Sequence, residues 1–227
     1  MDVKTLQGLI VSAGQPIAVD GQFGLRSRAA LREALTGPSD ALSPRDIAAA
    51  AEAYGLTVAM VGAVYDVESA GRGMSAATGL PVILYEPHVF SRQTQRRFDA
   101  SHPDISYAKW KTRPYPATQT GRWDQMLAAC ALSPSDALQS ASWGLGQVMG
   151  FNYRACGFSD IWGFVRAMAS GEGAQLLAML AFIKSKNLIP VLLRKDWATF
   201  ARVYNGDGQV PLYSRRLAEA YAKRGGR

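Results

Sequence analysis

The chain has 227 residues, 48% of them hydrophobic, and carries a formal net charge of +7. This length and composition predict a soluble folded protein with one full-sized domain and a small one, and the polar residues near the N-terminus exclude a secretion signal or a membrane span there. The excess of basic residues favours an acidic partner, such as nucleic acid, an anionic membrane surface or a bacterial wall polymer, without choosing among them.

The first predicted domain is small and helical and covers residues 1–37. Apolar residues recur at helical spacing in residues 3–10 and again in residues 30–35. The turn between them has two glycines, which permit positive φ, and Phe23 is expected to lie under the helices. A proline and polar residues follow, so residues 38–42 are predicted to be a linker.

The second predicted domain covers residues 43–227 and is mainly helical with a small β element. Residues 43–46 read Ser-Pro-Arg-Asp, which is a capping box with proline at the first helical position. The helix that starts there is expected to end at Gly55, and the next helix is expected to run from Thr57 to about Ser69.

The rest of the second domain is predicted from short signals. An apolar run at residues 81–85 is suited to a strand of a small sheet. From residue 122 onward, apolar spacing and capping residues again predict helices. The last helix has Leu212, Leu217, Ala218 and Tyr221 opposite Arg215, Arg216, Lys223 and Arg224. This cationic amphipathic helix is expected to cap the domain or, alternatively, to disturb an anionic outer membrane.

Glu68 continues the apolar stripe of its helix, four residues after Val64 and three after Tyr65. Burial disfavours a charged carboxylate, and the negative end of the helix dipole acts in the same direction, so a raised pKa is predicted for Glu68. Such a group can give a proton to a departing sugar oxygen, the step on which glycosidic cleavage depends. The alternative is a glutamate that is solvated or paired with Arg72.

Several motifs resemble, in the same order, those of the phage endolysin N-acetylmuramidase family, and the resemblance covers about residues 41–222. They are ESAGRG at 68–73, LYEPHVFSR at 84–92, FD at 98–99 with HPDIS at 102–106, SASWGLGQVMGFNY at 140–153 and YNG at 204–206. The resemblance implies a lysozyme-like fold of the α+β type, in which a catalytic glutamate ends a helix beside a small sheet. Soluble lytic transglycosylases have a similar glutamate-serine pair, glycine-leucine-x-glutamine-x-methionine segment and tyrosine-asparagine pair.

The same resemblance implies which residues contact the sugar. The expected substrate-binding residues are Ser142, Gln147, Tyr204 and Asn205, and Trp143 is expected at most to border the cleft. The chain departs from the family pattern at three positions, which affects the shape of the subsites. A second glycine is expected where Ala70 stands, a bulky residue where Gly146 stands and a basic residue where Pro87 stands.

Hydrolysis also needs a carboxylate that activates water or stabilises the transition state, and the distance between the two acids decides inversion or retention. Glu86, at the end of the predicted strand, is the first candidate, followed by Asp104 and then Asp99. The alternative for Glu86 is a salt bridge, for which Arg92, Arg96 and Arg97 are available.

Residues 1–37 resemble the three-helix peptidoglycan-binding domain of wall hydrolases, although they are shorter than the usual module. The resemblance implies that exposed groups around Asp20, Gln22 and Arg26 meet the wall. The alternative is a helical hairpin that only packs against the larger domain.

Metal chemistry lacks a suitable motif. His88, His102, Cys130 and Cys156 are not spaced as chelating pairs, so neither a metal nor another cofactor is expected. Both cysteines are expected to be reduced and buried.

These observations predict an endolysin that hydrolyses the β-1,4 bond between N-acetylmuramic acid and N-acetylglucosamine of peptidoglycan, with Glu68 and Glu86 as its catalytic acids. The resemblance implies a monomer with no nucleic-acid partner, made in the host cytoplasm and released to the periplasmic wall through a holin-type pore. Two alternatives stay open. One is a lytic transglycosylase that forms anhydro-muramyl products, and the other is a basic wall- or nucleic-acid-binding protein without turnover.

Overall fold

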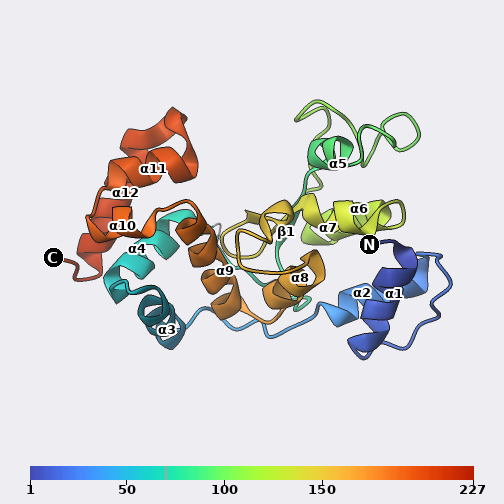
Figure 1. Ribbon diagram of the computed structural model, residues 1–227, viewed down its shortest axis with the longest axis horizontal. Coiled ribbons are helices and arrows are strands. Elements are labelled where there is room, and N and C mark those ends of the chain that lie inside the picture. Colours follow the sequence, from blue (N-terminus) through green and yellow to red (C-terminus); the bar gives the residue numbers. More distant parts are fainter. Residues whose placement is uncertain (70) are drawn as a thin grey trace.

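The computed structural model describes residues 1–69 and 71–227 and is mainly helical, with a small antiparallel sheet (Figure 1). Helices α1 (Val3–Ser12) and α2 (Leu25–Ala34) lie at one end of the elongated molecule, and the helices of the C-terminal part lie at the other end. The predicted fold class, mainly α with a small β element, is confirmed.

Helices α1 and α2 form an N-terminal hairpin that buries the apolar residues predicted from helical spacing. Leu6, Ile10 and Leu31 are fully buried, and Phe23 in the connecting turn is buried with them. These side chains belong to one hydrophobic cluster that continues into the larger part of the chain. The hairpin is also tied to that part by a hydrogen bond of 2.7 Å from Arg166 Nη1 to the carbonyl of Ala34.

Helices α3 (Pro44–Tyr54) and α4 (Val58–Glu68) begin and end where the capping residues predict. Ser43 forms the capping box of α3, and Gly55 ends that helix in the left-handed conformation with φ of +62°. Thr57 caps α4 by accepting a hydrogen bond from the backbone of the first turn. Local capping therefore fixes the helix that carries Glu68.

No single helix in the described part of the chain is long and apolar enough to cross a membrane. Helices α3 and α4 reach the required length and composition only when taken together, as a pair bent by 113°.

The sheet consists of β1 (Ile83–Tyr85), β2 (Ala141–Trp143) and β3 (Val148–Met149), in that order and antiparallel. In this register Leu84 lies opposite Ser142. Strand β1 was predicted, but the prediction of helices from residue 122 onward was wrong for β2 and β3. Strands of three and two residues are too short to show the alternation by which a strand is recognised.

The described chain contains eight further helices. They are α5 (Pro87–Gln93), α6 (Gln119–Cys130), α7 (Pro134–Gln139), α8 (Ile161–Ala169), α9 (Glu172–Ser185), α10 (Ile189–Leu193), α11 (Trp197–Asn205) and α12 (Val210–Lys223), with short 3₁₀ turns η1 (Gly150–Asn152) and η2 (Asp207–Gln209). Asp160 caps α8 and Asp196 caps α11, as predicted.

Helix α12 packs against both α4 and α11, and the three helices lie together at one end of the molecule (Figure 1). Its residues Leu217 and Tyr221 are buried, so the apolar face of this helix is covered by the domain that it caps. Arg224 follows α12 and pairs with Asp66 of α4 through two contacts of 2.7 Å. This packing brings the end of α11 to the end of α4.

The buried interior includes Trp143 and both cysteines. Trp143 does not border a cleft: it is fully buried, donates a hydrogen bond of 3.0 Å to the carbonyl of Leu138 and packs edge-on against Trp123. Cys130 and Cys156 are free and buried, and burial raises the pKa of each thiol to about 12. Both cysteines are core residues.

Candidate active site

Glu68 is the last residue of α4, and its carboxyl group is half-buried. Its Oε2 accepts a hydrogen bond of 2.7 Å from Nδ2 of Asn205, whereas Oε1 is buried and has no hydrogen-bond partner among the described residues. Burial raises the pKa of Glu68, and the hydrogen bond from Asn205 offsets part of that effect. The raised pKa predicted from the apolar stripe is therefore found in the structure.

Tyr204 lies beside Glu68 on the same helix as Asn205. Its ring stacks on Phe200 with the centroids 5.3 Å apart, and Phe182 packs edge-on against it. Burial raises the pKa of Tyr204, and the negative charge of Glu68 raises it further. The phenol therefore stays neutral and keeps a proton that it can donate. The structure thus brings together Glu68, Tyr204 and Asn205.

Arg72, the alternative partner considered for Glu68, is bound elsewhere. Its Nε donates a hydrogen bond of 2.9 Å to Glu172, and its Nη2 donates to the carbonyl of Ser39. Within the described chain, no basic side chain forms an ion pair with Glu68. The pKa of this carboxyl is therefore not lowered by a paired cation.

One face of the sheet is more open than the other. Ile83 and Tyr85 are buried, whereas Val82, Leu84 and Glu86 are half-buried. Successive side chains of a strand point to opposite faces, and the backbone of Glu86 is still extended, so these three residues share the open face. Directly opposite cross-strand residues also share a face, which places Ser142 there beside Leu84.

Gln147 braces the turn between β2 and β3. Its Oε1 accepts a hydrogen bond of 2.9 Å from Ser142, and its Nε2 donates to the carbonyls of Gly144 at 2.7 Å and Val82 at 3.3 Å. Its own φ is +46°, a left-handed conformation that non-glycine residues rarely adopt. The structure therefore joins Gln147, which is half-buried, to Ser142, which is 6% exposed, on this face of the sheet.

Glu86 precedes α5 and is held by aromatic neighbours. Its Oε2 accepts a hydrogen bond of 2.5 Å from the hydroxyl of Tyr115, and His88 Nδ1 lies 3.2 Å from the same oxygen without hydrogen-bond geometry. The described chain shows no ion pair between Glu86 and an arginine. It also shows no polar contact between Glu86 and Glu68, so the structure does not join the two predicted acids directly.

The other two candidate carboxylates have structural partners. Asp99 accepts hydrogen bonds of 2.9 Å from Ser91 and 2.5 Å from Ser106, and these bonds close the loop that follows α5. Asp104 is exposed and pairs with Arg113. Neither carboxylate contacts Glu68 in the described structure.

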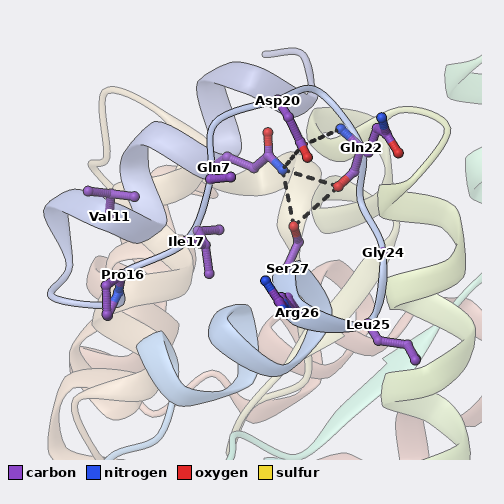
Figure 2. Close-up of a pocket in the computed structure, with 11 residues that line it drawn as sticks. Gln7, Val11, Pro16, Ile17, Asp20, Gln22, Gly24, Leu25, Arg26 and Ser27 are labelled. Carbon is purple, nitrogen blue, oxygen red and sulfur yellow. Dashed lines mark hydrogen bonds between the residues drawn. The ribbon is translucent and has the colours of Figure 1, made fainter.

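A separate hollow of about 700 Å³ lies in the N-terminal hairpin rather than beside Glu68 (Figure 2). Asp20, Gln22 and Arg26 line it, together with Gln7, Val11, Pro16, Ile17, Ala18, Gly24, Leu25 and Ser27. Gln7 is 1% exposed and fixes the turn by donating to Asp20, Gln22 and Ser27 and by accepting from the backbone of Gly21. Hydrogen bonds from the Gln22 backbone and the Gln7 side chain lower the pKa of Asp20, which keeps it charged.

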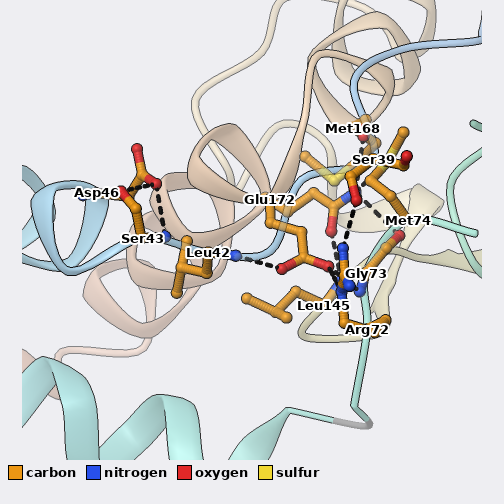
Figure 3. A network of polar contacts seen from close by, with 11 residues as sticks. Ser39, Leu42, Ser43, Asp46, Arg72, Gly73, Met74, Leu145, Met168 and Glu172 are labelled. Carbon is orange, nitrogen blue, oxygen red and sulfur yellow. Dashed lines mark hydrogen bonds and ion pairs between the residues drawn. The ribbon is translucent and has the colours of Figure 1, made fainter. Parts of the chain in front are cut away.

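Two buried polar residues of α9, Glu172 and Gln175, were not predicted. They are 2% and 1% exposed, and both contact the backbone of Gly73. Figure 3 shows Glu172 beside Gly73. Their positions continue the apolar stripe of Leu176 and Met179 at helical spacing. That is the signal that singled out Glu68, and it would have found these residues as well.

The departures from the family pattern have local reasons. A Cβ at Gly146 would lie 2.6 Å from Sδ of Met179, so Met179 fills the space that a bulky residue would need. Pro87 is the first residue of α5, where a missing N–H costs no helical hydrogen bond. Ala70 lies outside the described residues.

Comparisons with known proteins agree with this geometry. The crystal structure of a Burkholderia AP3 phage endolysin is similar to this chain with a TM-score of 0.75 and 30% sequence identity, over 99% of this chain and 96% of that one. This likeness confirms the lysozyme-like fold. Among curated proteins none matches the chain. Residues 57–224 match the family model of N-acetylmuramidases, and the chain therefore belongs to the N-acetylmuramidase family, which makes it a glycoside hydrolase that acts on peptidoglycan.

Proposed function

We propose that the enzyme hydrolyses the β-1,4 bond between N-acetylmuramic acid and N-acetylglucosamine, with Glu68 as the general acid. The observation that carries this proposal is the surroundings of Glu68: one oxygen is buried without a partner, and no cation is paired with the carboxylate in the described chain. Burial raises the pKa of Glu68, so the group holds a proton that it can give to the leaving sugar oxygen.

Asn205 indicates which oxygen carries the proton. Because the amide nitrogen of Asn205 donates to Oε2, Oε2 acts as an acceptor and the proton belongs on Oε1 of Glu68. Burying a charged Oε1 without a hydrogen bond costs more free energy than burying a protonated, neutral Oε1. Tyr204, neutral beside it, and Asn205 are proposed to hold the sugar.

Glu86 is proposed as the assisting carboxylate. It shares the half-buried face of the sheet with Ser142 and Gln147, which are proposed to bind the substrate. The hydrogen bond from Tyr115 fixes its orientation. In this role Glu86 activates water or stabilises the oxocarbenium-like transition state.

One observation favours a second reaction on the same substrate. No polar contact in the described chain joins Glu86 to Glu68, and a lytic transglycosylase needs only a single acid. In that case Glu68 acts alone, and the muramyl 6-hydroxyl attacks in place of water.

Digestion of purified sacculi tests both reactions. Wild-type enzyme is expected to clear the suspension and Glu68→Gln is expected to be inactive, while mass spectrometry of the products should show reducing ends. Anhydro-muramyl ends would instead show that the enzyme is a lytic transglycosylase. Clearance by Glu68→Gln at the wild-type rate would rule out Glu68 as the general acid, whereas no clearance by the wild-type enzyme would leave a basic wall-binding protein.

The N-terminal hairpin is proposed to be a wall-binding module of residues 1–37, joined by residues 38–42 to a catalytic domain of residues 43–227. The support is the hollow in the hairpin, which is lined by apolar side chains and by the charged groups of Asp20 and Arg26. The hollow lies apart from Glu68, so binding there leaves the proposed active site free.

The biological role is proposed to be host lysis by a phage enzyme, in keeping with the phage endolysin that this chain resembles. The enzyme would be made in the host cytoplasm and reach the periplasmic wall after a holin-type pore opens.

A contact with an anionic outer membrane is proposed for the exposed basic residues Arg215, Arg216 and Lys223 of α12. Glutamine at all three positions should lower killing of intact Gram-negative cells without slowing digestion of sacculi, and unchanged killing would remove the proposal.

A further inference from the structure

Glu172 is a buried carboxylate at the start of α9, and its hydrogen-bond partners lie in the segment that follows Glu68 and in the segment that precedes α3. Its Oε1 accepts hydrogen bonds of 2.9 Å from Arg72 and 2.8 Å from the backbone of Gly73, and its Oε2 accepts one of 2.8 Å from the backbone of Leu42 (Figure 3). Burial alone would raise the pKa of Glu172, but these hydrogen bonds outweigh it and lower the pKa. Glu172 is therefore a charged group held inside the protein.

Gln175 completes the anchor less than one turn later. Its Nε2 donates to the carbonyl of Gly73 at 3.2 Å and to that of Met168 at 2.8 Å, and its Oε1 accepts 2.8 Å from the backbone of Leu145. Gly73 is thus held at both its N–H and its C=O by α9. A Cβ at Gly73 would lie 1.9 Å from Oε1 of Gln175, so no side chain fits there.

Gly73 is the fixed end of the short segment that follows Glu68. The backbone of Val82 donates 2.9 Å to the carbonyl of Gly73, so the same residue also joins this segment to the approach to β1. At the other end of the segment, the backbone of Ser69 still bonds to Tyr65 of α4. Glu68 therefore lies between a rigid helix and an anchored glycine.

Arg72 belongs to the same segment, four residues after Glu68. Its side chain is 47% exposed, so packing holds it only in part, and its polar partners are Glu172 and the Ser39 carbonyl. Besides Glu172, the charged or titratable groups near Arg72 are Asp40 and Tyr65, and those facing Glu68 include Tyr204. Asn205, which also faces Glu68, is neutral. If Glu172 lost its charge, Asp40 would remain near Arg72, and Glu68, four residues earlier, would be the nearest carboxylate in sequence.

We propose that Glu172 is a positioning residue of the active site: it anchors the segment that follows Glu68 and binds Arg72, which keeps this cation from pairing with Glu68. The proposal rests on the proposed role of Glu68 as general acid. An opposite charge near a carboxyl group lowers its pKa. An Arg72 released from Glu172 would therefore cause Glu68 to lose its proton at a lower pH.

The test is the pH dependence of sacculus digestion by Glu172→Gln. A general acid loses activity as the pH rises through its pKa, so the alkaline limb is expected to move down by roughly 1 to 3 pH units, the usual effect of a nearby opposite charge. The maximal rate should fall while the sacculus concentration for half-maximal rate changes little, because the substrate-binding residues are untouched. An unchanged alkaline limb would overturn the proposal.

Two further variants separate the cation from the anchor. Arg72→Gln alone should keep the wild-type alkaline limb, since Glu68 has no paired cation in either case. The double variant Glu172→Gln/Arg72→Gln should restore that limb while the maximal rate stays low. A double variant with the same shifted limb as Glu172→Gln would show that Arg72 is not the cause.

Stability is controlled by comparison with Leu127→Ala, which removes a fully buried side chain of α6 that has no polar contact with Glu68. Its alkaline limb should match that of the wild type even where its melting temperature is lowered. If Glu172→Gln does not fold, Glu172→Asp is tested in its place, because aspartate keeps the charge on a shorter side chain. That variant should keep the alkaline limb and lose maximal rate, and a wild-type rate would overturn the anchoring role.

Failure of this inference differs from failure of the proposed function. If Glu68→Gln is active, Glu68 is not the general acid and the proposed function fails. If Glu68→Gln is inactive but Glu172→Gln keeps the wild-type alkaline limb, only the role of Glu172 is refuted.

Discussion

Asn205, the last residue of α11, donates a hydrogen bond of 2.7 Å to Glu68, the last residue of α4, although 137 residues separate the two in sequence. The contact exists because α12 packs against both helices. Local capping fixes the helix that carries Glu68, but the contact that orients its carboxyl group depends on the packing of the C-terminal helices.

Asn205→Ala should raise the pKa of Glu68, because the hydrogen bond from Asn205 lowers it in the native enzyme. The alkaline limb of activity should move to higher pH, while the maximal rate falls because the carboxyl group is less well oriented. The measurement is the rate of sacculus digestion across pH, with Gln209→Ala, an exposed amide in η2, as the control. A limb that moves to lower pH would contradict the assignment.

Glu68→Gln should stabilise the fold at neutral pH. A carboxyl whose pKa is raised on folding makes no difference to stability below its unfolded pKa, and it destabilises the fold increasingly as the pH rises toward its folded pKa. The amide removes this cost. The gain should be a few degrees in melting temperature, since about 1 kcal/mol corresponds to roughly 2–4 °C for a chain of this size.

Calorimetry at two pH values provides the check on that sign. The difference in melting temperature between Glu68→Gln and the wild type should be largest near pH 7 and should vanish near pH 3, where both side chains are neutral. An equal difference in melting temperature at both pH values would mean that the stability gain does not come from removing a buried charge.

Glu86→Gln should lower the rate of hydrolysis by roughly 10²–10⁴-fold, the usual contribution of a carboxylate that acts on a proton in the transition state. Tyr115→Phe should cause a smaller loss, because it removes only the hydrogen bond that orients Glu86. The matched control is Asp104→Asn, an exposed carboxylate paired with Arg113, which should act like the wild type. Full activity of Glu86→Gln would point to the mechanism with a single acid.

Helix ends and the acid itself could be predicted from sequence because their signals are local. Ser43 and Thr57 cap helices through neighbouring backbone groups, and Glu68 stands out on the apolar stripe of its own helix. The partner of Arg72 could not be predicted in this way. It depends on Glu172, one hundred residues away in sequence, and on the position that tertiary packing gives to α9. Strands β2 and β3 were missed for a similar reason, since two short strands are defined by pairing and not by periodicity.

Gly146→Ala should destabilise the fold by about 1–3 kcal/mol, the usual cost of adding a methyl group to a filled space. The added Cβ would meet Sδ of Met179 at 2.6 Å and its Cγ at 2.8 Å. Chemical denaturation of Gly146→Ala, Met179→Ala and the double variant gives the coupling between the two positions. In the Met179→Ala background, Gly146→Ala should lower the free energy of unfolding much less than it does in the wild type. Simple additivity would show that the glycine is needed for another reason.

Arg26→Glu should weaken binding of the enzyme to the wall without affecting its chemistry. The experiment uses full-length Glu68→Gln, which is expected to bind sacculi without cutting them, and measures the fraction that sediments with sacculi. Arg26 lines the hollow of the N-terminal hairpin, so reversal of its charge alters that surface but leaves the buried Gln7 that organises the turn. Arg154→Glu makes the same change in net charge at an exposed position outside the hollow and should sediment like the parent. Equal losses in both variants would mean that the overall positive charge binds the wall, and that the hollow does not.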